Sequence, residues 1–210
     1  MVLYAGIDET RKSPVLGSIV LCIALVPEED EELLRKKGVK DSKQIEQNKL
    51  HRLAKELKQK YAYKVIKIKP YIISQAENLN LLEAKYIIKL IKWSNKYAPK
   101  YIYLDSLTAN IQTCYNYFNT LNFKQSNFKI IPKADEKIIS VQVASIIAKY
   151  YSDKEIEYLK RKYPDMGSGE PYDKQTIAFL KKHLHNPPKD CIRTNWITFR
   201  RLLENDKNNL

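Results

Sequence analysis

Apolar residues follow two patterns along the chain. Short apolar runs bounded by Gly or Pro are typical of buried strands, whereas apolar residues spaced three or four apart indicate amphipathic helices. The first pattern predicts strands over residues 3–7, 17–26, 63–68, 101–104 and 129–131. The first two strands follow each other closely, so we expect them to pair as a hairpin.

Helical spacing fills most of the intervals between these strands and continues after the last one. We expect helices over residues 41–57, from about 80 to 98, over 110–121, from 136 to about 160, over 174–184 and over 195–203. Asp41 or Ser42 is the expected cap of the first helix. The acidic run 28–32 is a solvated turn or a helix start, and Gly and Pro residues make 162–173 a loop.

The helix predicted from residue 136 carries apolar side chains on nearly every side of its first half, as a helix buried in a core does. Val141 and Val143 also alternate as in a strand, but the length of the segment favours a helix. Two strands, then alternating helices and strands, then helices, predict a mixed α/β sheet with a C-terminal helical cap. At 210 residues and 44% apolar, the chain is long enough for a full core.

Acidic residues stand where three of the predicted strands end. Asp8 and Glu9 follow the first apolar run, Asp105 follows the fourth and Asp135 follows the fifth. Carboxylates at strand ends can converge on one sheet edge, and carboxylate oxygens are ligands for Mg²⁺. The pattern therefore predicts a divalent metal site. Each residue could also be a surface acid, and Asp135 could instead cap the helix that follows it.

The rest of the chain is strongly basic. Lys and Arg number 37 against 24 Asp and Glu, which gives a formal net charge of +13. Such a charge attracts phosphate backbones through a salt-sensitive electrostatic term. Together with the predicted metal site it indicates a nucleic-acid partner, although a Lys-rich proteome would produce the same composition.

Cysteine spacing and hydropathy indicate the cellular compartment of the protein. Cys22, Cys114 and Cys191 lie far apart, without the paired spacing of a zinc site or a disulfide framework. No apolar stretch approaches the roughly 20 residues that span a bilayer. No basic and then apolar leader precedes the first strand. We therefore expect a soluble, cytoplasmic protein.

Several short motifs lie in a fixed order over nearly the whole chain. They are Gly6-Ile7-Asp8-Glu9, Pro14-Val15-Leu16-Gly17, Gly38-Val39-Lys40-Asp41-Ser42-Lys43, Tyr103-Leu104-Asp105, Lys133-Ala134-Asp135, Val143-Ala144-Ser145-Ile146-Ile147-Ala148-Lys149 with Asp153, Gly167-Ser168-Gly169 and Arg193-Thr194-Asn195-Trp196. Any one of them would be a weak signal. In this order, they make the chain resemble type 2 ribonuclease H (ribonuclease HII) of the archaeal and eukaryotic kind.

The resemblance implies a fold and a domain organisation. The fold is ribonuclease H-like, a five-stranded mixed sheet flanked by helices and followed by a helical C-terminal cap. Residues 1–165 would form the catalytic domain. Residues 166–210 would form a C-terminal loop and helical extension packed on it, so that the two make one structural unit.

The resemblance also implies that Asp8, Glu9, Asp105 and Asp135 are catalytic and bind Mg²⁺ or Mn²⁺, two ions when substrate is present. Two such ions stabilise both the entering and the leaving oxygen in phosphodiester hydrolysis. Neighbouring residues of a strand point to opposite faces. Asp8 and Glu9 can therefore share a site only if the strand ends or bulges there.

The implied activity is that of a metal-dependent endonuclease. It would hydrolyse the RNA strand of RNA/DNA hybrids, or cut at ribonucleotides in duplex DNA, leaving 3′-hydroxyl and 5′-phosphate ends, and we expect a monomer. One alternative is a catalytically weak or inactive relative that only binds hybrid duplexes. The four carboxylates argue against it, because a pure binder would gain by losing like charges near phosphate. Another is a nuclease of the same fold that acts on DNA, which would leave the late motifs unexplained.

The chain departs from the family in two motifs that meet the ribonucleotide. The range 11–13 reads Arg-Lys-Ser where the family has Gly-Arg-Gly, and Glu170 replaces a Tyr that packs under the ribose. Both changes predict that the preference for a single ribonucleotide in duplex DNA is weakened or altered, toward longer RNA tracts. Tyr172 could move into the place of the missing Tyr or pack against the C-terminal cap, and we expect packing.

The candidate substrate contacts combine these motifs with basic residues near them. They are Arg11, Lys12, Ser13, Lys43, Lys149, Tyr172 and Arg193. Lys43 fits a role in positioning phosphate. Lys149 is explained equally well as the solvated edge of a buried helix. We expect Ser145 to serve in helix packing only.

Overall fold

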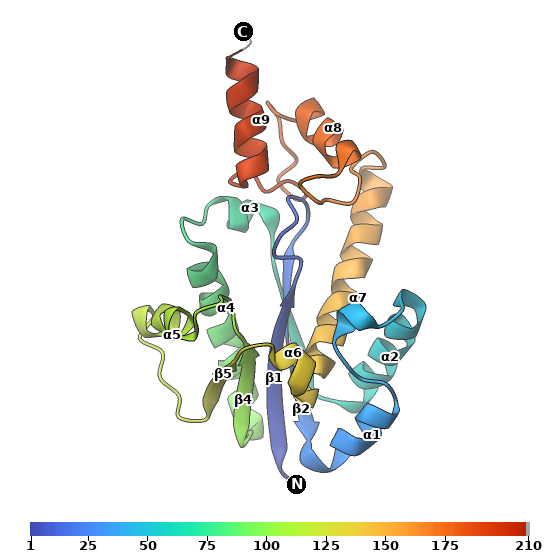
Figure 1. Ribbon diagram of the computed structural model, residues 1–210, viewed down its shortest axis with the longest axis vertical. Helices are drawn as coiled ribbons and strands as arrows, with labels where there is room; N and C mark the ends of the chain where they lie inside the picture. Colours follow the sequence, from blue (N-terminus) through green and yellow to red (C-terminus); the bar gives the residue numbers. More distant parts are fainter. Residues whose placement is uncertain (209–210) are drawn as a thin grey trace. The chain divides into compact units, whose positions relative to one another are not determined.

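The computed structural model describes residues 1–208, and within this range the strands form one five-stranded sheet in the order β3-β2-β1-β4-β5 (Figure 1). The strands are β1 (Leu3–Thr10), β2 (Ile19–Pro27), β3 (Tyr63–Ile68), β4 (Tyr101–Asp105) and β5 (Phe128–Ile131). β1 pairs antiparallel with β2 and parallel with β4, which in turn pairs parallel with β5. The predicted mixed sheet and its opening hairpin are confirmed.

The helices match the predicted ones with shifted ends and a few additions. They are α1 (Glu31–Lys36), α2 (Gln47–Lys60), α3 (Pro70–Ser74), α4 (Leu79–Ser94), α5 (Ile111–Thr120), α6 (Ala134–Lys137), α7 (Ile139–Lys162), α8 (Lys174–Lys182) and α9 (Ile197–Lys207), with short 3₁₀ turns η1 (Glu28–Asp30), η2 (Ser42–Gln44) and η3 (Asn95–Tyr97). Residue spacing does not predict α3, because five residues are too few to show helical periodicity.

Two predicted features of the helices are wrong. The long helix from residue 136 is interrupted at Ile138, whose φ of −106° and ψ of 117° are extended, so α6 and α7 are separate helices. Asp41 caps the 3₁₀ turn η2 by accepting from the Lys43 amide, whereas α2 is capped by Glu46. Residue spacing reveals neither the extended residue Ile138 nor the local bond between the Asp41 side chain and the Lys43 amide.

The described residues group into two compact units. The first contains residues 1–10, 20–66 and 80–151, and the second contains 11–19, 67–79 and the residues from 152 onward. This grouping differs from the expected division at residue 165, because two early segments join the C-terminal part. We call them the first unit and the second unit.

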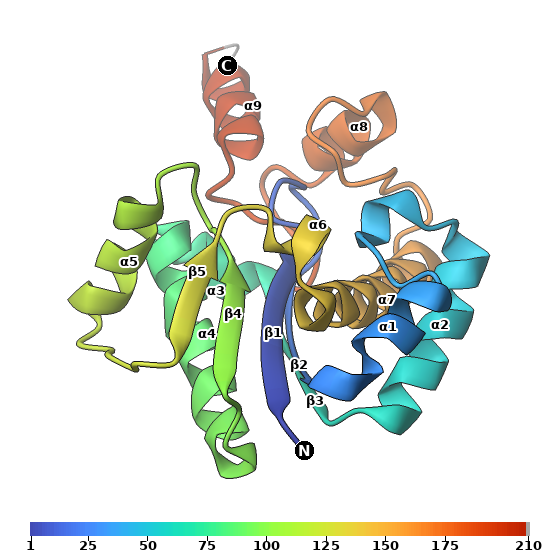
Figure 2. The same cartoon turned by 60° about the horizontal axis from the view of Figure 1, so that its bottom comes forward.

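The core of the first unit lies where α2 and α7 cover the sheet. Its buried side chains come from alternate positions of β2 and from the apolar faces of α2 and α7: Val20, Cys22, Ala24, Val26, Leu50, Leu53, Leu57, Val143, Ile146 and Ile147. Figure 2 shows α2 and α7 on one side of the sheet and α4 on the other. β2 is buried along nearly its whole length because helices cover both its faces.

Three further facts bear on the expectations from composition. Within residues 1–208 no helix combines the length and apolarity that crossing a membrane requires. The cysteines Cys22, Cys114 and Cys191 are buried free thiols. The second unit has an apolar cluster of its own, which includes Val15, Leu159, Phe179, Ile192 and Phe199.

Gly6 allows β1 to approach the start of α7 closely. A Cβ at this position would lie 2.1 Å from the carbonyl carbon of Ser140 and 2.2 Å from the amide nitrogen of Val141. Both atoms belong to the backbone and cannot rotate away. Only glycine therefore lets the helix lie this close to the strand, two residues before Asp8.

We predict that Gly6→Ala lowers the free energy of unfolding by about 3 kcal/mol, because overpacking against backbone cannot be relieved by a rotamer change. Urea denaturation measures the loss. Gly38→Ala is the matched control: its φ is +84°, and its added Cβ would meet only the flexible end of Lys49. That change should cost about 1 kcal/mol. Equal losses in the two variants would contradict the close approach.

Candidate active site

Asp8 lies inside β1, not at its end. The strand continues to Thr10, with Asp8 opposite Cys22 and Glu9 opposite Leu21 in β2. The expectation that the strand ends or bulges at Asp8 is therefore wrong. Because neighbouring strand residues point to opposite faces, Asp8 and Glu9 leave the strand in opposite directions. Asp8 is buried, with 7% of its surface exposed.

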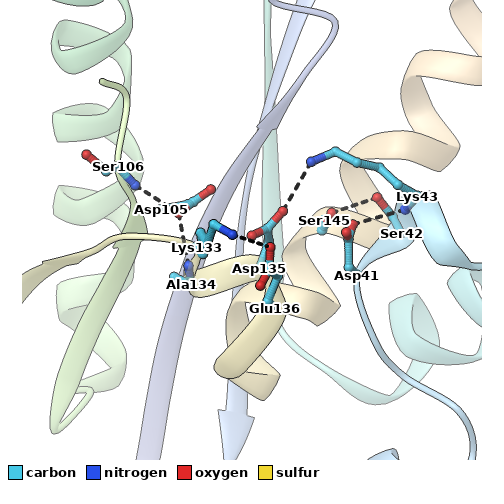
Figure 3. A network of polar contacts seen from close by, with 10 residues as sticks. All are labelled: Asp41, Ser42, Lys43, Asp105, Ser106, Lys133, Ala134, Asp135, Glu136 and Ser145. Atoms are coloured by element: carbon cyan, nitrogen blue, oxygen red, sulfur yellow. Dashed lines mark hydrogen bonds and ion pairs between the residues drawn. The ribbon is translucent and has the colours of Figure 1, made fainter. Parts of the chain in front are cut away.

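Asp105 is the last residue of β4, and backbone amides hold its carboxyl group. Its Oδ1 accepts from the Ser106 amide at 3.0 Å and from the Ala134 amide at 2.9 Å (Figure 3). The second bond ties the start of α6 to the end of β4. Both bonds go to Oδ1, so a cation bound by Oδ2 would not compete with them.

Asp135 is the second residue of the short helix α6 and is 6% exposed. Lys133, with a left-handed φ of 55°, turns the chain into this helix at the cap position. Asp135 lies inside the helix, so the alternative that it is the N-cap is wrong. Its Oδ2 is 3.3 Å from the Nζ of Lys43. Figure 3 shows Lys43 approaching Asp135 on the side away from Asp105.

Asp8 lies close enough to Asp105 and Asp135 for their charges to act on it, and Asp105 lies close enough to Asp135. Burial raises the pKa of Asp8 to about 7, a hydrogen bond from Ser145 opposes the rise, and the charges of Asp105 and Asp135 add to it. Burial also raises the pKa of Asp105; the Ala134 amide opposes this, and the charge of Asp135 adds to it. The structure thus brings these three predicted residues together, whereas Glu9 leaves the opposite face of β1.

Lys43 supplies positive charge beside these carboxylates. Burial lowers its pKa, but its hydrogen bond to Asp135 and the charges of Asp135, Asp41 and Asp8 raise the pKa overall. Its side chain remains 80% exposed. Lys43 can therefore neutralise Asp135 and still reach a ligand in solvent. A phosphate contact by Lys43 stays a prediction.

Ser145 does more than the helix packing we expected. Its hydroxyl bonds to Asp8 and lies 2.8 Å from the Ser42 hydroxyl, so it links β1, α7 and the turn that carries Lys43. The sequence held a signal for this role, because Ser145 is a polar residue in an apolar stretch of α7. The neighbouring Asp41 holds the turn by accepting from the Lys43 amide at 3.0 Å.

The donors present suit a hard divalent cation. Three carboxylates with an ammonium group beside them offer oxygen ligands and an excess of negative charge, which Mg²⁺ and Mn²⁺ prefer. Within residues 1–208, no three His, Cys, Asp or Glu side chains stand in ready-made metal geometry.

Arg193, in the second unit, is fully buried, which corrects the expectation that it contacts substrate. Its Nε donates to the Gly17 carbonyl at 2.8 Å, Nη1 to the Lys12 carbonyl at 2.9 Å and Nη2 to the Arg11 carbonyl at 2.7 Å. A buried side chain engaged in this way has no surface to offer a ligand. Arg193 instead fixes the backbone of the segment 11–17.

The other predicted contacts of this segment differ in exposure. Ser13 is exposed and its carbonyl accepts from the Trp196 indole at 2.8 Å, while Lys12 is half-buried. The side chain of Arg11 turns inward and donates to backbone carbonyls, so a direct contact between its guanidinium and substrate is not favoured. Contacts by Lys12 and Ser13 stay predictions.

Tyr172 and Lys149 complete the predicted set. Tyr172 is 82% exposed, so the expected packing against the C-terminal helices is wrong. Lys149 is half-buried on α7, and its contact with substrate stays a prediction.

Comparison with known proteins gives a consistent result. A family model described as Ribonuclease HII matches residues 5–199. Ribonuclease HII of Methanocaldococcus jannaschii is 37% identical, and the match covers 98% of this chain and 97% of that protein. The crystal structure of ribonuclease H2 from Pyrococcus horikoshii OT3 is 31% identical with a TM-score of 0.85, covering 99% of this chain and 100% of that one.

A more distant structural neighbour bears a metal ion. The crystal structure of Bst-RNase HIII in complex with Mn²⁺ has a TM-score of 0.82 and covers 99% of this chain and 71% of that one. At 20% identity it shows likeness of fold alone.

The raised pKa of Asp8 predicts how stability depends on pH in the absence of divalent cations. The folded-state pKa of about 7 lies above the ordinary 3.8. The carboxyl group therefore stabilises the fold below about pH 4, and this contribution is lost as the pH rises toward 7. Asp8→Asn cannot ionise. In urea denaturation with EDTA, the variant should be more stable than wild type at pH 8, and the difference should shrink toward pH 4. A difference independent of pH would contradict the shift.

Proposed function

The chain belongs to the ribonuclease HII family, and from this premise we propose that Asp8, Asp105 and Asp135 hold the divalent cation of its reaction. The chain has the ribonuclease H fold and is an endoribonuclease that cleaves RNA in RNA/DNA hybrids. The observation that carries the proposal is the placement of three carboxylates from β1, β4 and α6, in which Asp105 accepts from the amide that precedes Asp135 and Lys43 lies 3.3 Å from Asp135. The alternative of an inactive duplex-binding relative has no support in this site.

The cation is Mg²⁺ or Mn²⁺, with two ions when substrate is bound. A solved ribonuclease HIII binds Mn²⁺, which supports a divalent ion of this class. When bound, such ions stabilise the charge that develops on the entering and leaving oxygens of phosphodiester hydrolysis. Glu9 stays a prediction as the fourth ligand: in the register of β1 its side chain leaves the strand on the face opposite Asp8, so sharing a cation with Asp8 would require the strand to bend at this point.

Residues of the chain itself keep the carboxylates in fixed orientations in the absence of a cation. Asp105 keeps its orientation through two backbone amides, and Asp8 is oriented by Ser145. Near neutral pH, Asp8 is partly protonated in the free protein, so its proton would have to leave before the carboxylate could serve as a cation ligand. Lys43, paired with Asp135 at 3.3 Å but with its side chain 80% exposed, would place its ammonium group beside a phosphate of the substrate.

The substrate is RNA/DNA hybrid or duplex DNA that contains ribonucleotides, and the products carry 3′-hydroxyl and 5′-phosphate ends. The net charge of +13 supports binding to the phosphate backbone. Lys43, Lys149, Lys12, Ser13 and Tyr172 are the proposed contacts. The departures at residues 11–13 and 170 favour longer RNA tracts over a lone ribonucleotide.

The oligomeric state and the cellular location of the protein are proposed from its apolar clusters and its cysteines. We propose that the protein acts as a monomer. The apolar faces of its helices are accounted for by the two apolar clusters within the chain itself. We propose the cytoplasm as its location, since three unpaired thiols are typical of a reducing compartment.

We predict that Asp105→Asn lowers kcat on RNA/DNA hybrid by about 10³-fold, because it removes a charged ligand of the cation. The fold should be retained, since an amide oxygen can still accept from Ser106 and Ala134. Stabilisation by Mn²⁺ in thermal unfolding should be lost together with activity. Asp165→Asn is the matched control, an exposed Asp paired with Lys182 in the second unit. Full activity in Asp105→Asn would show that the site is elsewhere.

Substrate preference is predicted from Glu170 and residues 11–13. Cleavage of a hybrid with a long RNA tract should exceed cleavage of duplex DNA that contains one ribonucleotide, compared as kcat/KM. Tyr172→Phe tests the exposed tyrosine hydroxyl: if Tyr172 replaces the missing family Tyr, the variant should lose activity on the single-ribonucleotide substrate first. Strict cutting at a lone ribonucleotide, unchanged in Tyr172→Phe, would contradict both the altered preference and the role of Tyr172.

A further inference from the structure

Arg11 has a backbone conformation that residues with a Cβ usually avoid. Its φ is 63°, in the left-handed region that favours glycine. It directly follows Thr10, the last residue of β1, and it begins the segment 11–17. A residue stays in such a conformation only when its surroundings hold it there. The Arg11 side chain is therefore expected to make contacts that a glycine could not.

The guanidinium of Arg11 joins two stretches of the second unit. Its Nη2 donates to the Leu16 carbonyl and to the Ser168 carbonyl, each at 3.3 Å. It also lies directly on Gly169, where an added Cβ would be 2.7 Å from Nη2. A side chain at this position would force the guanidinium to shift from its present place. Arg11 and the turn 168–170 thus fit each other closely.

Glu170 supplies charge for this buried group. Glu170 directly follows Gly169, the residue that the Arg11 guanidinium approaches, and it brings a carboxylate to the turn that accepts from Arg11. A partly buried cation is costly unless opposite charge compensates it. Glu170 is half-buried beside the same contact. The two residues that depart from the family pattern therefore bring opposite charges to the same contact.

The turn is anchored on two sides, and Arg11 contributes to only one of them. Asp173, the N-cap of α8, accepts from the amide and the hydroxyl of Ser168 at 2.6 and 2.7 Å. On the other side, the Gly169 carbonyl accepts from the Val15 amide at 2.9 Å, next to the bond from Arg11. Loss of Arg11 would therefore loosen the attachment to the segment 11–17 and leave the attachment to α8.

We propose that Arg11 and Glu170 are coupled positioning residues that hold the turn 168–170 against the segment 11–17 and thereby set how the enzyme discriminates between ribonucleotide substrates. The inference rests on the proposed function, because both stretches are proposed to face the ribonucleotide. The two departures from the family are then one change made in two places. An inward-facing Arg needs Glu170 near it, and Glu170 next to a phosphate backbone is tolerated because Arg11 balances its charge.

Two variants disturb this contact from opposite sides. Arg11→Gly removes the guanidinium and relieves the left-handed φ, whereas Gly169→Ala places a Cβ against Nη2. The measured quantity is the ratio of kcat/KM for RNA/DNA hybrid to kcat/KM for duplex DNA with one ribonucleotide. Each variant should change this ratio by about fivefold or more through KM, with kcat on the hybrid within about twofold of wild type. An unchanged ratio in Arg11→Gly, with the protein folded, would overturn the inference.

A double-mutant cycle tests the coupling itself. If the residues act as a pair, Glu170→Gln should alter the ratio in wild type and have little further effect in Arg11→Gly. Effects that simply multiply would overturn the coupling. Arg11→Lys keeps the charge and should restore part of the wild-type ratio, which a purely steric role of Arg11 would not explain.

A control and a reference separate this inference from the proposed function. Lys182→Gln breaks an exposed ion pair with Asp165 in the same unit and should leave the ratio unchanged. If wild type cleaves neither substrate, or if Asp105→Asn keeps full activity, the proposed function fails. If wild type is active and depends on Asp105 but the ratio is insensitive to Arg11 and Glu170, only the positioning role fails.

Discussion

The first unit depends on one constraint: it holds negatively charged side chains close together where they are largely buried from water. Asp8, Asp105 and Asp135 come from β1, β4 and α6, and burial and mutual repulsion raise the pKa values of the first two. Such a cost is tolerated when other groups compensate it. The amide of Ala134 and the ammonium of Lys43 do so in the free protein, and a divalent cation would do so far more strongly.

The backbone around this site is shaped to keep the carboxylates in place. Gly6 lets α7 begin close against β1, which sets Ser145 beside Asp8. The left-handed turn at Lys133 starts α6 so that its first amide binds Asp105 and its second residue is Asp135. In the second unit, too, buried polar contacts hold the backbone in place, but the buried group is an arginine instead of carboxylates. There a buried Arg193 binds three carbonyls, and so the segment after β1 has a defined path.

Residue patterns predicted the sheet, most helices and the order of the motifs, because buried strands and amphipathic helices leave periodic signals. They failed where a few local bonds decide the structure. No period distinguishes a strand that ends at Ile7 from one that runs on to Thr10, and so the sequence left open whether Asp8 and Glu9 can share a site. The break at Ile138 has the same origin. Burial of Arg193 and the inward turn of Arg11 were also out of reach, since arginine is usually exposed.

The most direct test of the shared cation site is proton release on Mg²⁺ binding, measured by calorimetric titration in two buffers of different ionisation enthalpy. With the pKa of Asp8 at about 7, binding at pH 7 should release about half a proton per chain, and the release should disappear by pH 9. Saturable binding without proton release at pH 7, or no binding at all, would contradict the account, because Asp8 would then not share a cation with Asp105 and Asp135.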